Sequence, residues 1–454
     1  MRVVHVPFGY YPDPVGGTEV YVAGLASGLR ARGVESVVVA PASASGEQRY
    51  EHQGTPVYRF TLPPSERVEE LYGDGDAAAA DAIASIVDEV RADVLHLHAF
   101  TRAASLRAAK AARRCGAAVV FTYHTPTASC VRGTLMRDGH APCDGVLDAR
   151  RCTACLLESR GLPLAIREPL SHVPATLSAA LASGAKGSWA TAVRARELTT
   201  SRHNAFRGLL KEADAVVAVC EWVRALLLSA GADPSTVMLS RQGTPIRVPT
   251  LPTAARTPRA DATLRLAFVG RMHPAKGVHV AVSALSARPD LAATLDVFAT
   301  VQDDDGARYR SAVCSAVAGD ARIRLCGPVP QDRVVETLAG YDATVVPSQW
   351  LETGPLTVLE SFAAGVPVIG SDLGGIAELV THDRDGWLVP HSDVRAWSAA
   401  IERLASERAL VERLRGGVRR PRSTEDVARD MVSIYESVVP RRRGVSFAST
   451  AGVA

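Results

Sequence analysis

Short apolar runs and helical stretches alternate along this chain in two separate series. The first series has seven strand-like runs, at residues 3–7, 36–40, 57–60, 94–98, 119–123, 216–220 and 237–240. The second has five, at residues 266–269, 295–299, 323–326, 343–346 and 366–370. Segments with helical spacing, such as 18–32 and 77–91, lie between most of these runs. Continuous apolar strands that alternate with helices indicate parallel sheets covered on both faces, so the pattern predicts an α/β protein.

A segment with almost no periodicity separates the two series. It covers residues 244–263 and contains four prolines. We therefore predict two doubly wound domains, at residues 1–245 and 264–439, with a linker over 246–263 and a disordered tail over 440–454. Ligands of such sheets bind beyond the carboxyl ends of the strands, so two facing domains would share a central cleft.

Composition excludes several classes of function. The chain is 47% apolar and 22% charged, which is typical of a globular protein, and its formal net charge is +3. Aromatic residues make up 5%, with no aromatic and basic platform, so we expect no nucleic-acid partner. The apolar runs are too short to span a membrane, and the first run resembles a core strand rather than a signal peptide. These features predict a cytoplasmic protein.

Two glutamates stand eight residues apart where an apolar strand turns into a helix. Glu352 precedes the expected helix and Glu360 lies inside it, while Thr353 and Pro355 are expected to provide the N-cap and the first turn. The amides at such a helix start favour anions, and carboxylates accept hydrogen bonds from hydroxyls. A nucleotide-sugar offers both phosphates and hydroxyls. The alternative is a pair of surface glutamates.

Two cations open the second domain. Arg271 and Lys276 flank a tight, proline-containing turn after the strand at 266–269. Such a pair can clamp a diphosphate, because Arg binds in a bidentate manner and Lys acts as a point charge. The alternative is two exposed basic residues in a loop.

The first domain offers weaker signals. Gly16 and Gly17 precede the helix that Thr18 can cap, which suits close approach of a ligand but is also typical of an ordinary turn. His124 ends the strand at 119–123 on the expected cleft side, where a substrate-contacting and a structural role are both open. For His96 we favour a structural role.

Seven stretches along the chain form one combined pattern. They are GGTE at 16–19, DVLHLH at 93–98, His124, AVCEWVR at 218–224, Gly270-Arg271 with Lys276-Gly277, the segment 352–360, and GVPVIGSDLGGIAE at 365–378. This pattern resembles the retaining glycosyltransferases of family 4, which have the two-domain GT-B fold. The resemblance covers most of the chain.

The resemblance implies a nucleotide-sugar donor, such as a UDP- or GDP-sugar, bound by the second domain. Glu352 and His124 would act on the transferring sugar, and Glu360 would bind the nucleotide ribose. Arg271 and Lys276 would hold the diphosphate, and the glycine loop would close over it. The implied donor-binding residues are Arg271, Lys276, Glu360, Gly354, Pro355, Leu356, Gly16 and Gly17.

The implied reaction moves a hexose-type sugar to a hydroxyl of a sugar, a lipid-linked or a small-molecule acceptor, with retention of configuration. No cofactor or divalent metal is expected for catalysis, because Arg and Lys would stabilise the leaving diphosphate. The chain departs from the family at Gln242-Gly243, where an Asn-Gly turn is usual, and this puts the contact there in doubt. Three alternatives stay open: a sugar phosphorylase, a nucleotide-sugar hydrolase, or a non-catalytic partner subunit.

Four of the eight cysteines lie together in an insertion at about residues 128–160. Cys130, Cys143, Cys152 and Cys155 match the ligand count of a tetrahedral structural zinc site, and His140 is a substitute ligand. A redox CxxC, at Cys152 and Cys155, and unligated thiols are the alternatives.

A basic segment with apolar residues follows at 186–211. Basic amphipathic helices can lie on anionic membranes, which leaves peripheral membrane contact open. The alternative is a solvated helix face packed against the first domain.

Overall fold

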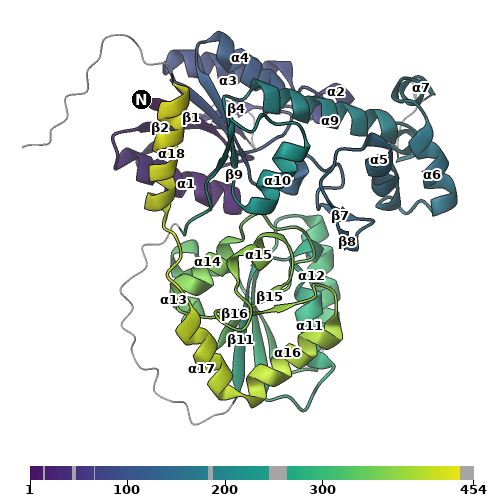
Figure 1. The fold of residues 1–454 in the computed structure, drawn as a ribbon, viewed down its shortest axis with the longest axis vertical. Helices are drawn as coiled ribbons and strands as arrows, with labels where there is room; N and C mark the ends of the chain where they lie inside the picture. Colours follow the sequence, from purple (N-terminus) through teal and green to yellow (C-terminus); the bar gives the residue numbers. More distant parts are fainter. Residues whose placement is uncertain are drawn as a thin grey trace, which may run out of the picture.

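The computed structural model describes residues 1–13, 16–42, 48–65, 67–181, 188–244, 263–317 and 319–439. The predicted linker lies outside these residues except for its last position, and so does the whole predicted tail. The described chain forms two α/β units stacked along the long axis of the molecule (Figure 1). Two doubly wound units were predicted from the apolar pattern, and this fold class is confirmed.

The first unit is built on an eight-stranded sheet. Its strand order is β10-β9-β6-β5-β1-β2-β4-β3, and every neighbouring pair is parallel except β3 and β4. Its strands are β1 (Arg2–Val6), β2 (Glu35–Ala42), β3 (Gln48–His52), β4 (Thr55–Thr61), β5 (Val94–Leu97), β6 (Ala118–Tyr123), β9 (Ala215–Ala218) and β10 (Val237–Leu239). The edge strand β3 is polar, QRYEH, so no apolar run predicted it.

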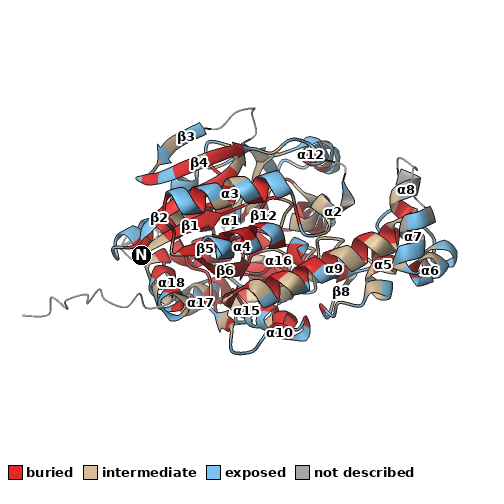
Figure 2. Cartoon of the chain, turned by 90° about the horizontal axis from the view of Figure 1, so that it is seen from above, coloured by how far each residue is buried: buried red, intermediate tan, exposed pale blue. Residues whose placement is uncertain are grey.

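Helices cover both faces of this sheet. Successive strand residues such as Val3 and Val4 belong to different core clusters, because their side chains point to opposite faces of the sheet. The helices of this unit are α1 (Gly17–Arg30), α2 (Val68–Leu71), α3 (Ala77–Glu89), α4 (Leu106–Arg114), α9 (Ala195–Glu212) and α10 (Glu221–Ser229). The central strands β5 and β6 are buried along their whole length, and β1 is buried from Val3 onward (Figure 2).

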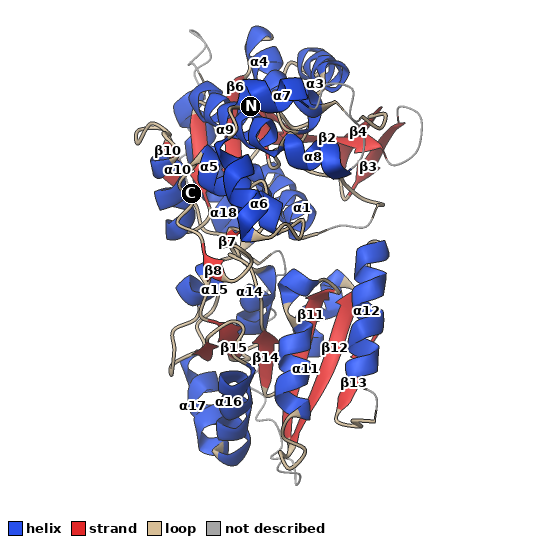
Figure 3. Ribbon diagram, turned by 90° about the vertical axis from the view of Figure 1, so that its right-hand side faces the viewer, coloured by secondary structure: helices blue, strands red, loops and turns tan. Residues whose placement is uncertain are grey.

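The second unit is a six-stranded parallel sheet in the order β13-β12-β11-β14-β15-β16 (Figure 3). Its strands are β11 (Leu264–Arg271), β12 (Ala293–Thr300), β13 (Ile323–Cys326), β14 (Ala343–Val346), β15 (Val368–Ser371) and β16 (Gly386–Val389). Its helices are α11 (Val278–Ser286), α12 (Asp304–Ala316), α13 (Val334–Leu338), α14 (Leu356–Ala363), α15 (Gly374–Leu379), α16 (Val394–Ser406) and α17 (Arg408–Gly417). Short 3-10 turns η2 (Pro274–Lys276) and η3 (Gln331–Arg333) precede α11 and α13.

The last helix, α18 (Thr424–Val438), packs on the first unit and not on the second (Figure 1). Its residues Val427, Met431 and Tyr435 share a core cluster with Leu25 and Leu29 of α1. The predicted second domain, 264–439, included this helix, and that assignment is wrong for it. Sequence alone gave no sign of the crossing, because an amphipathic helix fits either sheet equally well.

An arm projects from the first unit between β6 and α9 (Figure 1). It contains the turn η1 (Pro126–Ala128), the hairpin β7 (Met136–Arg137) and β8 (Ala141–Pro142), and the helices α5 (Ala149–Glu158), α6 (Leu164–His172), α7 (Ala175–Leu181) and α8 (Ser188–Val193). The insertion predicted at 128–160 is therefore the beginning of this arm. None of the helices in the described part of the chain is long and apolar enough to span a bilayer.

The basic segment predicted at 186–211 begins outside the described residues and continues into α9. Arg202 is buried, donates to the carbonyls of Phe100 and Thr127, and lies over the Phe100 ring. Arg194 pairs with Glu197. Arg202 therefore packs inside the first domain, whereas Arg194 forms a local ion pair at the start of α9.

Candidate active site

The point where strand order reverses lies between β11 and β14 in the second sheet. The chain runs from β11 outward to β13 in one direction and from β14 outward to β16 in the other. Ligands of doubly wound sheets bind in the crevice at such a reversal. Arg271 is the last residue of β11, Lys276 lies in η2 just beyond it, and Glu352 follows β14. The topology thus collects these sequence-predicted residues at one edge.

Lys276 and Glu352 form an ion pair at this edge. Lys276 Nζ lies 2.6 Å from Glu352 Oε1 and 5.4 Å from the centre of the Trp350 ring. Ser348 Oγ donates to the same carboxylate oxygen over 2.8 Å. The side chains are 8% exposed for Glu352 and 21% exposed for Lys276, so both charges are largely removed from solvent.

Burial by itself would raise the pKa of Glu352. The charge of Lys276 and the hydrogen bonds from Lys276 and Ser348 outweigh it, and the pKa lies below the ordinary value. Glu352 is therefore a carboxylate at neutral pH, and it can accept hydrogen bonds from hydroxyl groups.

A glycine permits the close approach of the two loops. Gly277 has φ of +73°, and a Cβ there would lie 1.7 Å from the carbonyl oxygen of Pro347. Any side chain would push η2 away from the end of β14 and separate Lys276 from Glu352.

Arg271 lies close to the same turn. Its Nη1 donates to Gln302 Oε1 over 3.3 Å, and it is partly exposed. Burial and then the positive charge of Arg271 lower the pKa of His273, with a smaller effect from Lys276. His273 begins η2, where its Nδ1 accepts the amide of Ala275. The turn therefore presents two cations around a histidine that is kept neutral.

The helix after Glu352 starts later than predicted. Helix α14 begins at Leu356, and Pro355 is its N-cap rather than a first-turn residue. Thr353 does not cap it, because its hydroxyl donates instead to the carbonyl oxygen of His124 over 2.6 Å. The prediction of Thr353 as N-cap was wrong, because a partner in the other domain competes for the hydroxyl. Gly354 lies against the side chain of Gln242.

Glu360 lies in α14 and is 4% exposed. Its Oε1 accepts a hydrogen bond from Gln331 Nε2 over 2.6 Å. Burial raises its pKa to about 7, and the Gln331 bond only partly opposes this. The pKa values of the two glutamates are thus shifted in opposite directions, because Glu352 has a cation beside it, whereas the hydrogen-bond partner of Glu360 is neutral.

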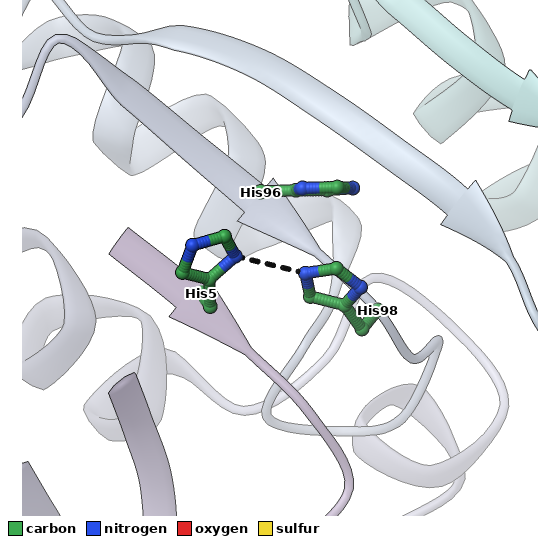
Figure 4. Close-up of side chains that lie close together, drawn as sticks. All are labelled: His5, His96 and His98. Atoms are coloured by element: carbon green, nitrogen blue, oxygen red, sulfur yellow. Dashed lines mark hydrogen bonds between the residues drawn. The ribbon is translucent and has the colours of Figure 1, made fainter. Parts of the chain in front are cut away.

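His124 ends a chain of buried histidines in the first domain. The amide nitrogen of Gln242 can only donate, so His124 Nδ1 accepts this bond over 3.3 Å. The His124 proton then lies on Nε2 and is donated to His98 Nδ1 at 3.2 Å, and His98 Nε2 donates to His5 Nδ1 at 3.0 Å (Figure 4). Burial lowers the pKa of His124 to about 3, so the ring is neutral. The hydrogen bonds to Gln242 and His98 fix the tautomer of the His124 ring.

One ring nitrogen from each of His5, His96 and His98 lies within 4.8 Å of the other two, a spacing that could suit a metal ion. Each ring nitrogen already has a partner within the protein. Those of His96 lie 2.7 Å from Tyr435 Oη and 2.7 Å from Thr122 Oγ1, and His5 Nε2 lies 3.3 Å from Ser36 Oγ. The cluster is therefore a hydrogen-bonded core network.

Four contacts that no sequence argument predicted join the two domains beside the site. The Glu378 carboxylate accepts the amides of Glu221 and Trp222, at the start of α10, over 2.9 and 2.8 Å, and also binds Arg241. Trp222 Nε1 donates to the carbonyl oxygen of Glu352 over 3.1 Å. The motifs at 218–224 and 365–378 contained Glu221, Trp222 and Glu378 but gave them no role. Helix N-termini favour carboxylates, so Glu378 could in principle have been found.

The glycine pair lies at the start of α1. Gly16 donates its amide to Glu19 Oε2 over 2.8 Å, which satisfies one free amide of the helix end. A Cβ on Gly17 would lie 3.6 Å from Leu356 Cδ1, so this loop contacts the beginning of α14 across the cleft. The four predicted metal-ligand cysteines do not join this site. They line a separate small cavity in the arm.

Comparisons with known proteins agree with this geometry. The family model described as glycosyl transferase 4-like domain matches residues 16–243, half of the chain, and the model described as glycosyl transferases group 1 matches residues 263–407.

A D-inositol 3-phosphate glycosyltransferase of Acidothermus cellulolyticus is 28% identical over 260 residues, which is 52% of this chain and 57% of that protein. Among solved structures, sucrose-phosphate synthase of Thermosynechococcus elongatus superposes with a TM-score of 0.66 at 19% identity, covering 96% and 98% of the two chains. Anabaena HepE in complex with UDP and glucose gives a TM-score of 0.63 at 14% identity, over 96% and 100%. These two structural neighbours establish the GT-B fold.

Proposed function

Because this chain belongs to the group 1 glycosyltransferases, with glycosyl transferase 4-like and group 1 domains at 16–243 and 263–407, we propose that it transfers a hexose from a nucleoside-diphosphate sugar to an acceptor hydroxyl with retention of configuration. The Lys276–Glu352 pair at the reversal of the second sheet is the observation that carries this proposal.

The charges at this edge suit the donor. Lys276 and Arg271 offer cations for a diphosphate, and positive charge there would stabilise the leaving group as its bond to the sugar breaks. Glu352 offers a carboxylate acceptor for sugar hydroxyls. Glu360, four residues into α14, would accept the ribose hydroxyls of the nucleotide. No general base is assigned to the protein. The donor phosphate would receive the acceptor proton, on the face from which the leaving group departs.

The first domain supplies the opposite wall. The backbone carbonyl of His124 accepts a hydrogen bond from the hydroxyl of Thr353, the neighbour of Glu352 in the chain, and the His124 ring is neutral. Gln242 orients its ring, so the residue that replaces the usual Asn of the family retains a contact to the site. We propose that His124 contacts the transferring sugar. Domain contacts through Trp222 and Glu378 would limit water access and so donor hydrolysis.

The relatives suggest donors and acceptors for a first screen. One is named for an inositol phosphate, and one structural neighbour was solved with UDP and glucose. We therefore propose a UDP-, ADP- or GDP-hexose as donor and a polyol, a polyol phosphate or a glycan hydroxyl as acceptor. A peripheral contact with a lipid-linked acceptor is a further proposal, and vesicle co-sedimentation would test it.

Product analysis tests the function. The protein would be incubated with each nucleotide-sugar and a mixture of acceptors, and the anomeric configuration of any glycoside would be read by proton NMR. We expect an α-linked product from an α-linked donor. A β-linked product would overturn retention, and release of free sugar with no glycoside would favour the hydrolase.

A sugar phosphorylase and a non-catalytic subunit would each behave differently in such assays. The phosphorylase would release sugar phosphate from a glycoside in the presence of inorganic phosphate. The non-catalytic subunit would neither turn over nor bind a nucleoside diphosphate, and calorimetry with UDP, ADP and GDP would detect that binding.

A further inference from the structure

Four cysteines from three segments of the arm converge on one cavity of about 30 Å³. Cys130 follows η1, Cys143 follows β8, and Cys152 and Cys155 lie on α5. Residues three apart on a helix share a face, which explains why both α5 sulfurs face the cavity. All four cysteines are free thiols in the structure.

The walls of this cavity combine apolar residues with cations. Val131, Leu135 and Met136 provide the apolar part, and Arg132 and Arg151 lie beside them. Four thiolates around one Zn²⁺ carry two net negative charges, so nearby arginines favour such a centre. Arg132 also pairs with Glu158, and Arg151 with Asp144, which holds both guanidinium groups in place.

Backbone amides point at the sulfurs. The amide of Asp138, in the turn of the hairpin, donates to Cys155 Sγ over 3.3 Å, and the amide of Gly145 donates to Cys143. Asp138 has φ of +50° and Gly145 has φ of +74°, so both loops adopt left-handed backbone to direct these amides. Amide donors are the usual outer partners of metal-bound ligands.

We propose that Cys130, Cys143, Cys152 and Cys155 bind one structural Zn²⁺, which fastens the β7–β8 hairpin to α5. No three of these sulfurs lie within 4.8 Å of one another in the described structure, so the ion would draw the hairpin and α5 together around the cavity. Zn–S bonds of about 2.3 Å close such a site completely, and no position is left for substrate.

A redox role does not fit this setting. A nucleophilic CxxC cysteine lies at a helix start with a lowered pKa. Cys152 is the fourth residue of α5 and Cys155 is the seventh, whereas Asp148 is the N-cap, so neither cysteine lies at the helix start.

The zinc site would support the active site indirectly. The amide of Leu351, the residue before Glu352, donates to the carbonyl of Thr134 over 3.2 Å, and His391 Nε2 lies 3.1 Å from the carbonyl oxygen of His140. Both first-domain residues belong to the loop and hairpin between Cys130 and Cys143. Fixing this loop would therefore fix how the arm meets the second domain.

Metal analysis tests the proposal independently of activity. The untagged protein would be purified without chelator and its metals measured by plasma mass spectrometry. We expect about one zinc per chain in the wild type and in the control Cys115→Ser/Cys314→Ser, whose cysteines are exposed and remote. The Cys152→Ser/Cys155→Ser variant should fall below a tenth of this. Equal zinc in that variant and the wild type would overturn the site.

A Co²⁺ titration of the wild-type protein tests the site even if the Cys152→Ser/Cys155→Ser variant fails to fold. Wild-type protein stripped of metal by chelator would be titrated with Co²⁺, and tetrahedral thiolate ligation gives intense visible absorption bands together with sulfur-to-metal charge transfer. These bands, bleached by one equivalent of Zn²⁺, would support the site. Their absence, with four thiols still reactive or paired as disulfides by mass mapping, would contradict it.

Discussion

Lys276 Nζ lies 2.6 Å from Glu352 Oε1, although 76 residues separate them in the chain. The contact exists because β11 and β14 are neighbours in the sheet and both residues follow the carboxyl ends of these strands. The pair is more than a surface ion pair, because the Glu352 side chain is only 8% exposed and takes a second hydrogen bond from Ser348. A buried carboxylate that loses its cation carries a large desolvation penalty.

The first prediction concerns this pair. Glu352→Gln and Lys276→Ala should each lower transfer by at least about a hundredfold, because each removes a charge placed for the donor or sugar. Lys276→Ala should also lower the free energy of unfolding by about 3 kcal/mol, since it leaves a buried carboxylate unpaired. Initial rates and urea unfolding would measure the two effects.

The double variant and a surface lysine provide the controls. Lys276→Ala/Glu352→Gln should be more stable than Lys276→Ala alone, because the unpaired charge is gone. Lys211→Ala changes an exposed residue of α9 and should leave both rate and stability near the wild type. Normal turnover by Glu352→Gln would disprove the site assignment.

The second prediction uses the pKa of Glu360. Because burial raises it from 4.5 to about 7, the protonated form contributes stability below pH 4.5, and this contribution is lost as pH rises through about 7. The wild type should therefore lose up to roughly 3 kcal/mol relative to Glu360→Gln between pH 4.5 and 8. Urea unfolding of both proteins across this range would measure the difference. If the free energies of unfolding of the two proteins changed in parallel with pH, the pKa of Glu360 would not be raised by folding.

The same residue should make donor binding depend on pH. If the ionised carboxylate accepts the ribose hydroxyls, affinity for the nucleoside diphosphate should rise about tenfold from pH 6 to pH 8, as the ionised fraction grows. The Glu360→Gln variant should bind the nucleoside diphosphate weakly, with an affinity that does not change between pH 6 and pH 8. Calorimetry at both pH values measures it, with buffers matched for ionisation enthalpy.

The sequence predicted those features of the fold and the site that depend on local patterns of apolar residues. Apolar runs predicted the two sheets, and strand ends placed Arg271, Lys276 and Glu352 at one edge, because the topology of doubly wound sheets is regular. The polar strand β3 gave no such run, and the four-residue strand β16, with sequence GWLV, was not predicted. Helix α18 gave a correct helical pattern but no information on which domain it packs against.

Contacts between polar residues that are distant in the chain could not be predicted from the sequence. Gln242 and His124 are 118 residues apart, and nothing in either segment specifies that an amide will hold the imidazole. Thr353 matched the chemistry of an N-cap, yet its hydroxyl has a partner in the other domain. Local propensity is a weak guide wherever a domain interface offers a competing hydrogen bond.

The third prediction concerns Glu378, which links the second domain to the start of α10. Glu378→Ala should lower the free energy of unfolding by about 2 kcal/mol, because two amides and Arg241 lose a charged acceptor. It should also raise the radius of gyration in X-ray scattering, since the domains lose this connection. Glu412→Ala, at an exposed position of α17, should change neither quantity. An unchanged scattering curve for Glu378→Ala would show that other contacts suffice to hold the domains.

The last prediction tests whether α18 is an integral part of the first domain. Tyr435 is fully buried, and its hydroxyl lies 2.7 Å from His96 Nδ1. Tyr435→Phe preserves the ring but leaves a buried imidazole nitrogen without a partner, so the free energy of unfolding should fall by about 1–3 kcal/mol. Tyr58→Phe, at a partly exposed position of β4, should change it by less than about 0.5 kcal/mol. Urea unfolding followed by circular dichroism measures both. If Tyr435→Phe matched the wild type, the helix would contribute packing alone, and the histidine network would not depend on it.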